Sequence, residues 1–154
     1  MIYEPNAYTI TRFQYAVRAA FLMSCFGNSP NETTLTDSDK KYMEELGVLN
    51  PGEEIQLFYT QGGVKGIKQS GNLITSERIA AYWIEDNDKE IHSALFASEI
   101  DSITTKDLVN NPLYSSYIKV YKKNGEIFSA YIDADSTKTY QFFQQAIDNL
   151  EKAR

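Results

Sequence analysis

The sequence predicts an α+β fold in which two helices precede an antiparallel β-barrel of about seven strands, and a C-terminal helix caps the barrel. Three observations support this prediction. Apolar residues recur at helical spacing before Asn50, short alternating runs separated by turn residues follow Pro51, and the C-terminal segment returns to a helical period. A length of 154 residues is sufficient for one domain with a short appendage.

The N-terminal region contains the two expected helices. The first has one apolar face, made of Phe13, Ala16, Val17, Ala20, Met23 and Ser24, and Gly27-Asn28 follows as a stop. The second is expected to begin at Thr36 or Asp37, whose side-chain oxygens can accept hydrogen bonds from unpaired backbone amides, and to end at Gly47. We predict that residues 1–48 form a helical extension that packs on the barrel.

The segment after Pro51 contains the expected strands. They are Glu54–Thr60, a weaker run Val64–Gln69, Asn72–Thr75, Arg78–Glu85, Glu90–Phe96, Ile100–Thr105, Tyr117–Lys122 and Ile127–Ile132. Asn124-Gly125 is typical of a two-residue hairpin turn. The final helix begins at Asp135 or Ser136, and its apolar face is expected to contain Tyr140, Phe143, Ile147 and Leu150, with Phe142 and Ala146 beside them.

The turn at residues 75–78 has a predicted structural role. The hydroxyl of Thr75 is placed to bond a turn amide, as threonines in tight turns do. Arg78 opens the following strand, and we expect it to form an exposed ion pair with Glu77, Glu99 or Asp101, a kind of pair that contributes little stability.

Four segments, in order along the chain, carry a family resemblance: Leu49–Ile55, Gly71–Ile79, Ser98–Ile103 and Asn124–Phe128. Followed by a capping helix, they resemble a bacterial pleckstrin-homology-like (PH-like) domain, close to the GRAM and YokE-like families, over residues 49–154. The resemblance implies a PH-like barrel. It also implies that a strand edge beside the C-terminal helix can accept an extended peptide by strand addition. Because such folds host many ligands, the resemblance alone does not name one.

The composition excludes several classes of function. Lys and Arg number 15 against 21 Asp and Glu, a net charge of −6 that argues against a nucleic-acid partner. A single cysteine, Cys25, and a single histidine, His92, cannot form a His/Cys zinc site, and they give no catalytic pair. We therefore expect no catalytic residue, metal or cofactor. The expected function is a non-catalytic binding or scaffolding module that mediates protein–protein interaction or self-association, so that a homo-oligomer is one expected assembly. No apolar run approaches the roughly 18–20 residues of a membrane span, so a cytoplasmic location is expected.

The alternative function is binding of an anionic lipid or phosphate head group. In phosphoinositide-binding PH domains the basic residues lie on the first two strands and their loop, where this chain has Lys65 and Lys68 among glycines. Backbone amides and ammonium groups attract anions. The surrounding segment has an excess of acidic residues, which disfavours association with an anionic membrane.

The first helix offers a candidate interaction surface, because Phe13, Phe21 and Phe26 give it more apolar area than one narrow stripe requires. Packing against the barrel is the first interpretation. Docking to a second copy or to another protein is the second. A helix on a membrane surface is the third, disfavoured because only Arg12 and Arg18 provide positive charge.

Overall fold

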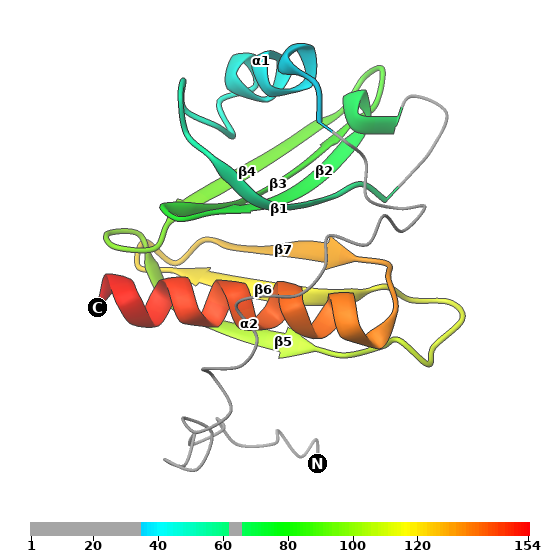
Figure 1. Ribbon diagram of the computed structural model, residues 1–154, viewed down its shortest axis with the longest axis vertical. Coiled ribbons are helices and arrows are strands. Elements are labelled where there is room, and N and C mark those ends of the chain that lie inside the picture. Colours follow the sequence, from blue (N-terminus) through cyan, green and yellow to red (C-terminus); the bar gives the residue numbers. More distant parts are fainter. Residues whose placement is uncertain (1–34, 62–65) are drawn as a thin grey trace.

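The computed structural model describes residues 35–61 and 66–154 (Figure 1). The first predicted helix, with Phe13, Phe21 and Phe26, lies outside the described residues, as does Lys65. In chain order the elements are α1 (Asp37–Glu45), β1 (Ile55–Tyr59), the 3-10 helix η2 (Gly66–Lys68), β2 (Ser70–Thr75), β3 (Arg78–Ile84), β4 (Lys89–Leu95), β5 (Ile100–Lys106), β6 (Ser116–Lys122), β7 (Ile127–Ile132) and α2 (Ser136–Ala153).

The strands form two antiparallel sheets, in the orders β1-β2-β3-β4 and β5-β6-β7. In Figure 1, α1 lies above the first sheet, and the second sheet and α2 lie below it. The α+β class and the C-terminal helix are thus confirmed. The sheets do not close into one barrel, because no strand pairing joins them in the described part of the chain. At the end of β4 the Glu99 carboxylate accepts the Leu95 amide at 2.7 Å, and the chain turns there into the second sheet.

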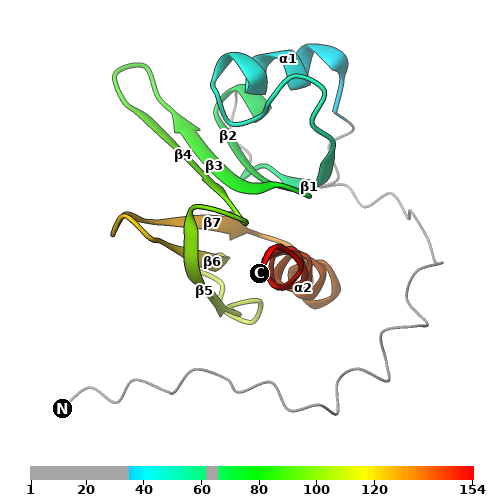
Figure 2. The ribbon, with the colours of Figure 1, turned by 90° about the vertical axis from the view of Figure 1, so that its left-hand side faces the viewer.

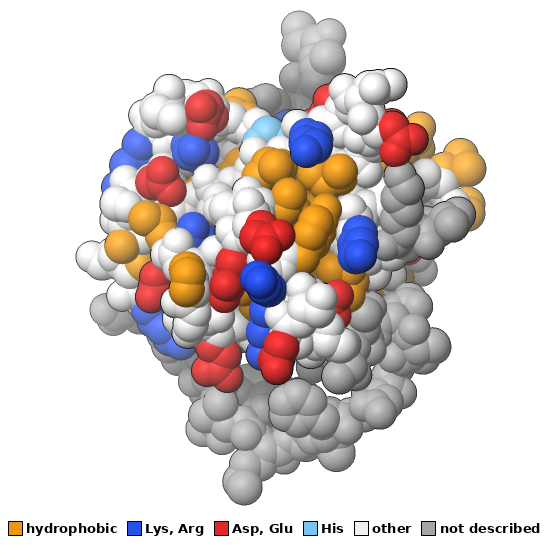
Figure 3. All heavy atoms as spheres, turned by 90° about the horizontal axis from the view of Figure 1, so that it is seen from above, with side chains coloured by type: hydrophobic (Ala, Val, Ile, Leu, Met, Phe, Trp, Pro, Cys, Tyr) orange, Lys and Arg blue, Asp and Glu red, His pale blue; other side chains and the backbone are white. Residues whose placement is uncertain are grey.

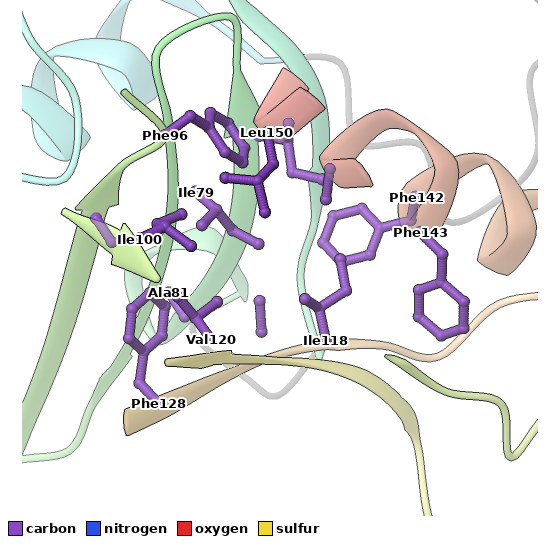
Figure 4. Close-up of a cluster of buried hydrophobic side chains, with 14 of the residues drawn as sticks. Ile79, Ala81, Phe96, Ile100, Ile118, Val120, Phe128, Phe142, Phe143 and Leu150 are labelled. Carbon is purple, nitrogen blue, oxygen red and sulfur yellow. The ribbon is translucent and has the colours of Figure 1, made fainter. Parts of the chain in front are cut away.

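The centre of the first sheet, at β2 and most of β3, is buried on both faces. One face packs against β6, β7 and α2 in the larger core, where side chains from both sheets meet Phe142 and Phe143 of α2 (Figure 4). The opposite face packs under α1 and the turn after it, through Met43, Val48 and Leu49. Every residue of β2 is buried as a result. Each large apolar side chain in these cores contributes about 1.5–3 kcal/mol of transfer free energy.

The second predicted helix is confirmed as α1, with Thr36 as its N-cap. The Thr36 hydroxyl accepts the Asp39 amide while the Asp39 carboxylate accepts the Thr36 amide, a reciprocal capping box. The predicted strand Val64–Gln69 is wrong, because Gly66–Lys68 forms the helix η2. Its carbonyls are bound by tyrosine hydroxyls instead of a strand: Tyr42 donates to Lys68 at 2.9 Å and Tyr82 donates to Ile67 at 2.7 Å.

The final helix α2 begins after Asp135, whose carboxylate accepts the Lys138 amide at 3.0 Å. Its buried face consists of Thr139, Phe142, Phe143, Ala146, Asn149 and Leu150. Tyr140, predicted to be buried, is 63% exposed. The rotation follows from Asn149, whose side-chain amide donates to the Gln56 side chain and to the Thr75 carbonyl, each at 2.7 Å. These two bonds orient the helix with Asn149 inward and Tyr140 outward.

A buried polar network joins the start of β1 to the β2–β3 turn. The Thr75 hydroxyl accepts the amides of Glu77 and Arg78 at 3.1 and 3.0 Å, so its predicted turn role is confirmed, and it donates to the Glu53 carboxylate. The same carboxylate lies 3.0 Å from the Arg78 guanidinium, and the two side chains are only 3% and 10% exposed. The expected exposed pairing of Arg78 with Glu77, Glu99 or Asp101 is therefore wrong, because Glu53 lies opposite the turn and satisfies the buried guanidinium.

Removing the Glu53 carboxylate should strongly destabilise the fold. Glu53→Ala leaves the Arg78 guanidinium and the Thr75 hydroxyl buried without their partner, and breaking a buried ion pair in this way typically costs about 3–5 kcal/mol. Urea denaturation followed by circular dichroism measures the loss. The neighbouring exposed Glu54 provides the control, since Glu54→Ala should leave the midpoint close to that of the wild type. Equal effects of the two substitutions would contradict the network.

Gly71 should not tolerate a side chain. It lies opposite Tyr82 in the β2–β3 pair, and a Cβ on Gly71 would be 2.5 Å from the tyrosine ring. The ring cannot move away without breaking the hydroxyl bond to Ile67, so we expect Gly71→Ala to cost about 1–3 kcal/mol. The same substitution in a Tyr82→Ala background should cost much less, which a double-mutant cycle of denaturation free energies measures. Additive effects would exclude the steric explanation.

Candidate functional site

A groove of about 190 Å³ opens where the end of the β3–β4 hairpin diverges from β7. Figure 2 shows the hairpin extending away from the second sheet at this place. The lining is partly aromatic and partly polar, and consists of Gln61, Asn72, Ala81, Tyr82, Trp83, Glu90, His92, Ser129 and Tyr131. Three of these residues lie on β3, two on β4, two on β7 and one on β2, so both sheets contribute to the groove.

The first wall is the inner face of the hairpin. Ala81 pairs with His92 and Trp83 pairs with Glu90, so alternation along the strands brings all four side chains to one face. The Trp83 indole donates to the Glu85 carboxylate at 3.0 Å, which holds the ring. The exposed His92 ring stacks on Phe128 of β7, with ring centroids 5.2 Å apart and planes 9° apart. This stacked pair connects the two walls.

The second wall is the free edge of β7. The amide of Tyr131 donates to the buried side chain of Asn72 at 2.8 Å, so the outward backbone groups of Tyr131 face β2 and not β6. Ser129, two residues earlier, has its backbone groups on the same side. In the described residues no group forms a hydrogen bond with the Ser129 amide or carbonyl outside the β6–β7 pair. An unsatisfied edge position therefore opens into the groove.

The charges around the groove favour a cationic ligand group. Glu90 lines it directly, and Glu85, Asp86 and Asp88 continue the hairpin, with Lys89 as the only base among them. Clefts lined by one sign of charge concentrate ligands of the opposite sign. A Lys or Arg side chain that entered beside Glu90 would also lie near the Trp83 and Tyr131 rings, which attract cations through their faces.

The groove contains three residue types that occur in catalytic sites, namely the imidazole of His92, the carboxylate of Glu90 and the hydroxyl of Ser129. In a catalytic pair, the nucleophile and its general base must lie within hydrogen-bond distance of each other. Over the described residues no hydrogen bond joins His92 to Ser129 or to Glu90, and no group of His, Cys, Asp and Glu is arranged to hold a metal ion. What the groove does provide is aromatic surface, a carboxylate and an open strand edge.

Of the two lysines of the candidate anion site, the structure places Lys68, whereas Lys65 lies outside the described residues. Lys68 is exposed at the end of η2, and its carbonyl is bound by Tyr42. Hydrogen bonds from Thr36 lower the pKa of Asp39, and the nearby positive charge of Lys68 lowers that pKa further. The negative charge of Asp39 opposes the attraction of an added anion to Lys68.

The sequence did not indicate the groove. Alternation along residues 78–85 and 90–96 predicted which side chains share a face, and the short Asp86-Asn87-Asp88 turn fixes the register that places Trp83 opposite Glu90. The alternation does not indicate that this end of the hairpin diverges from the second sheet (Figure 2), which is what opens the groove. The His92 side chain is exposed at this end of the hairpin.

In the described part of the chain no helix has the length and apolar character needed to cross a membrane. Comparisons with family models, with curated proteins and with solved structures find no match. The likeness to PH-like domains therefore rests on the sequence motifs alone.

Proposed function

We propose that the protein is a non-catalytic binding module whose groove between the β3–β4 hairpin and β7 receives an extended segment of a partner protein. The observation that carries this proposal is the free backbone of Ser129, which opens into a groove lined by Trp83, Tyr131 and Glu90. Unpaired strand edges are templates for strand addition, in which main-chain hydrogen bonds give affinity and side-chain pockets give specificity.

The partner segment lies antiparallel or parallel to β7 and exchanges hydrogen bonds with the Ser129 amide and carbonyl. Every second side chain of the segment then points to the hairpin wall. A Lys or Arg at such a position meets Glu90 with its charge and the Trp83 ring with its aliphatic stem. The preferred ligand is thus an extended segment that alternates basic or apolar residues with polar ones.

The PH-like interpretation supports a binding role, and the two sheets of four and three strands with a C-terminal helix are compatible with it. In that family the strand edge beside the C-terminal helix is the expected peptide site. Here β5 is the edge strand near that helix, and the Arg154 guanidinium donates to the Asp101 carbonyl on it. The β7 edge is favoured because it offers an open backbone position and aromatic walls together.

Peptide selection tests this function. A displayed library of random peptides is enriched on the wild-type protein, and binding is followed by the fluorescence of Trp83, the only tryptophan of the chain. We expect enriched peptides to contain Lys or Arg and to change the Trp83 emission. Glu90→Lys should weaken binding about 10-fold or more, because it replaces the attractive charge with a repulsive one.

Ser129→Pro tests the backbone contact separately, since it removes the edge amide while edge strands tolerate proline. It should abolish binding with an unchanged circular dichroism spectrum. Tyr140→Ala is the control, because Tyr140 is an exposed aromatic on α2, away from the groove, and its loss should not alter affinity. Selected peptides whose affinity survives both Glu90→Lys and Ser129→Pro would refute groove binding.

The anionic-ligand alternative predicts a different result. We expect the protein to sediment no more with phosphatidylserine vesicles than with neutral phosphatidylcholine vesicles, because the charge of Asp39 opposes that of Lys68 and the first sheet carries many acidic residues. Preferential sedimentation with the anionic vesicles that Lys65→Ala/Lys68→Ala abolishes would establish the alternative.

A further inference from the structure

The free edge of β4 carries a second set of unpaired backbone groups. Glu85 and Asp88 exchange hydrogen bonds across the turn, and the Phe96 amide donates to the Glu77 carbonyl at 2.9 Å. The direction of the backbone amides and carbonyls alternates along a strand. The backbone groups of Glu90 and His92 therefore bond to β3, whereas those of Lys89, Ile91 and Ser93 point away from β3. Of the residues that the structure describes, none forms a backbone hydrogen bond with these three outward positions.

The side chains along this edge are also uncovered. The first four residues of β4, Lys89–His92, are all exposed, and Ile91 in their middle is 38% exposed. Ile91 lies on the same face of the sheet as α1, and the half-buried side chains of Ile84 and Leu95 lie on that face as well. Figure 3, which views the molecule from the α1 side, shows hydrophobic side chains exposed on this face between basic and acidic ones.

We propose that two copies of the chain pair antiparallel through β4, about a two-fold axis at Ile91, to form one continuous eight-stranded sheet. In this register Ile91 faces Ile91 of the second copy, Lys89 faces Ser93, and Glu90 faces His92. Two identical edges satisfy each other's outward amides and carbonyls, as an isologous interface requires. The exposed isoleucines bury each other at its centre, and each carboxylate meets an imidazole.

Other registers on the same edge are disfavoured by charge and by contacts already made. An axis at Lys89 would set two lysines against each other and Glu90 against Asp88. An axis at Ser93 would require the Leu95 backbone to pair, yet the Leu95 amide is already bound by the Glu99 carboxylate. Pairing about Ile91 is free of both conflicts.

Pairing through β4 would also enlarge the groove. Glu90 and His92 both line its hairpin wall, so the second copy brings its own Glu90 and His92 to the same inner face of the joined sheet. The wall then becomes continuous between the two molecules. The dimer itself rests on the β4 edge and not on the proposed peptide binding, so either can fail without the other.

Light scattering after size exclusion tests the dimer. The wild type should elute at about twice the monomer mass of 17.5 kDa, and Ile91→Lys should elute as a monomer, because two lysines then oppose each other at the axis. Ile127→Lys is the matched control: Ile127 is 55% exposed on β7, and its substitution should leave the dimer intact. A monomeric wild type, or a dimer that survives Ile91→Lys, would overturn the proposal.

Disulfide trapping tests the register. In a Cys25→Ser background, Glu90→Cys and Lys89→Cys chains are each mixed with His92→Cys chains and oxidised. Positions 90 and 92 would form a non-hydrogen-bonded pair with Cα atoms about 4.5 Å apart, within disulfide range. We expect cross-linked heterodimers from Glu90→Cys with His92→Cys, and few from either variant alone or from the Lys89→Cys mixture. Equal cross-linking in all samples would overturn the register.

The two proposals are separated by one further measurement. Peptides selected on the wild type should still bind Ile91→Lys and change its Trp83 fluorescence, because the β7 edge is unaffected. Loss of the dimer with retained peptide binding supports both proposals. Loss of peptide binding in a folded Ile91→Lys monomer would show that the groove requires the second copy, and would contradict the independence of the two sites.

Discussion

The arrangement of the sheets depends on the buried carboxylate of Glu53. It accepts the hydroxyl of Thr75 and pairs with Arg78, and both charged side chains are almost completely buried. A buried charge costs several kcal/mol unless it is paired, so this corner admits few other geometries. The Thr75 carbonyl extends the contact to Asn149 of α2. One polar cluster therefore fixes the start of β1, the β2–β3 turn and the rotation of the final helix relative to each other.

The exposed end of the hairpin is a consequence of this anchoring. At the polar corner the first sheet is covered by α1 on one face and by the second sheet and α2 on the other, which is why β2 is buried throughout. The end of the β3–β4 hairpin diverges from the second sheet (Figure 2), and the first four residues of β4 are exposed. Among the described residues, this end of the hairpin therefore has both an open edge on β4 and an open wall facing β7. The groove and the β4 edge thus have one origin.

Local elements could be predicted from the sequence, whereas contacts between distant segments could not. The capping box at Thr36 and the hydroxyl of Thr75 each depend on residues a few positions apart. The two-residue hairpin turn expected at Asn124-Gly125 is wrong, because Lys122 pairs with Glu126 and three residues connect them, with Gly125 at a positive φ. The pair of Glu53 with Arg78 spans 25 residues, and many acids compete for that arginine in the sequence. The predicted burial of Tyr140 is wrong for a related reason. The hydrogen bonds of Asn149 set the rotation of the helix, and a pattern of apolar residues does not include this polar side chain.

The distribution of side-chain contacts along the sheet edges favours a surface made for pairing. Natural edge strands avoid unwanted pairing by placing charges on them or by covering their backbone. Here such cover is found at single positions: Asn72 binds the Tyr131 amide on β7, Glu99 binds the Leu95 amide on β4, and Arg154 binds the Asp101 carbonyl on β5. The middle of β4 is different, because its central outward residue is the apolar Ile91. Its flanking side chains become complementary when a second copy pairs about that residue, because the Glu90 carboxylate then faces the His92 imidazole. An edge strand that avoids pairing with a second copy would place like charges opposite each other in every register. The β4 edge does not have this pattern.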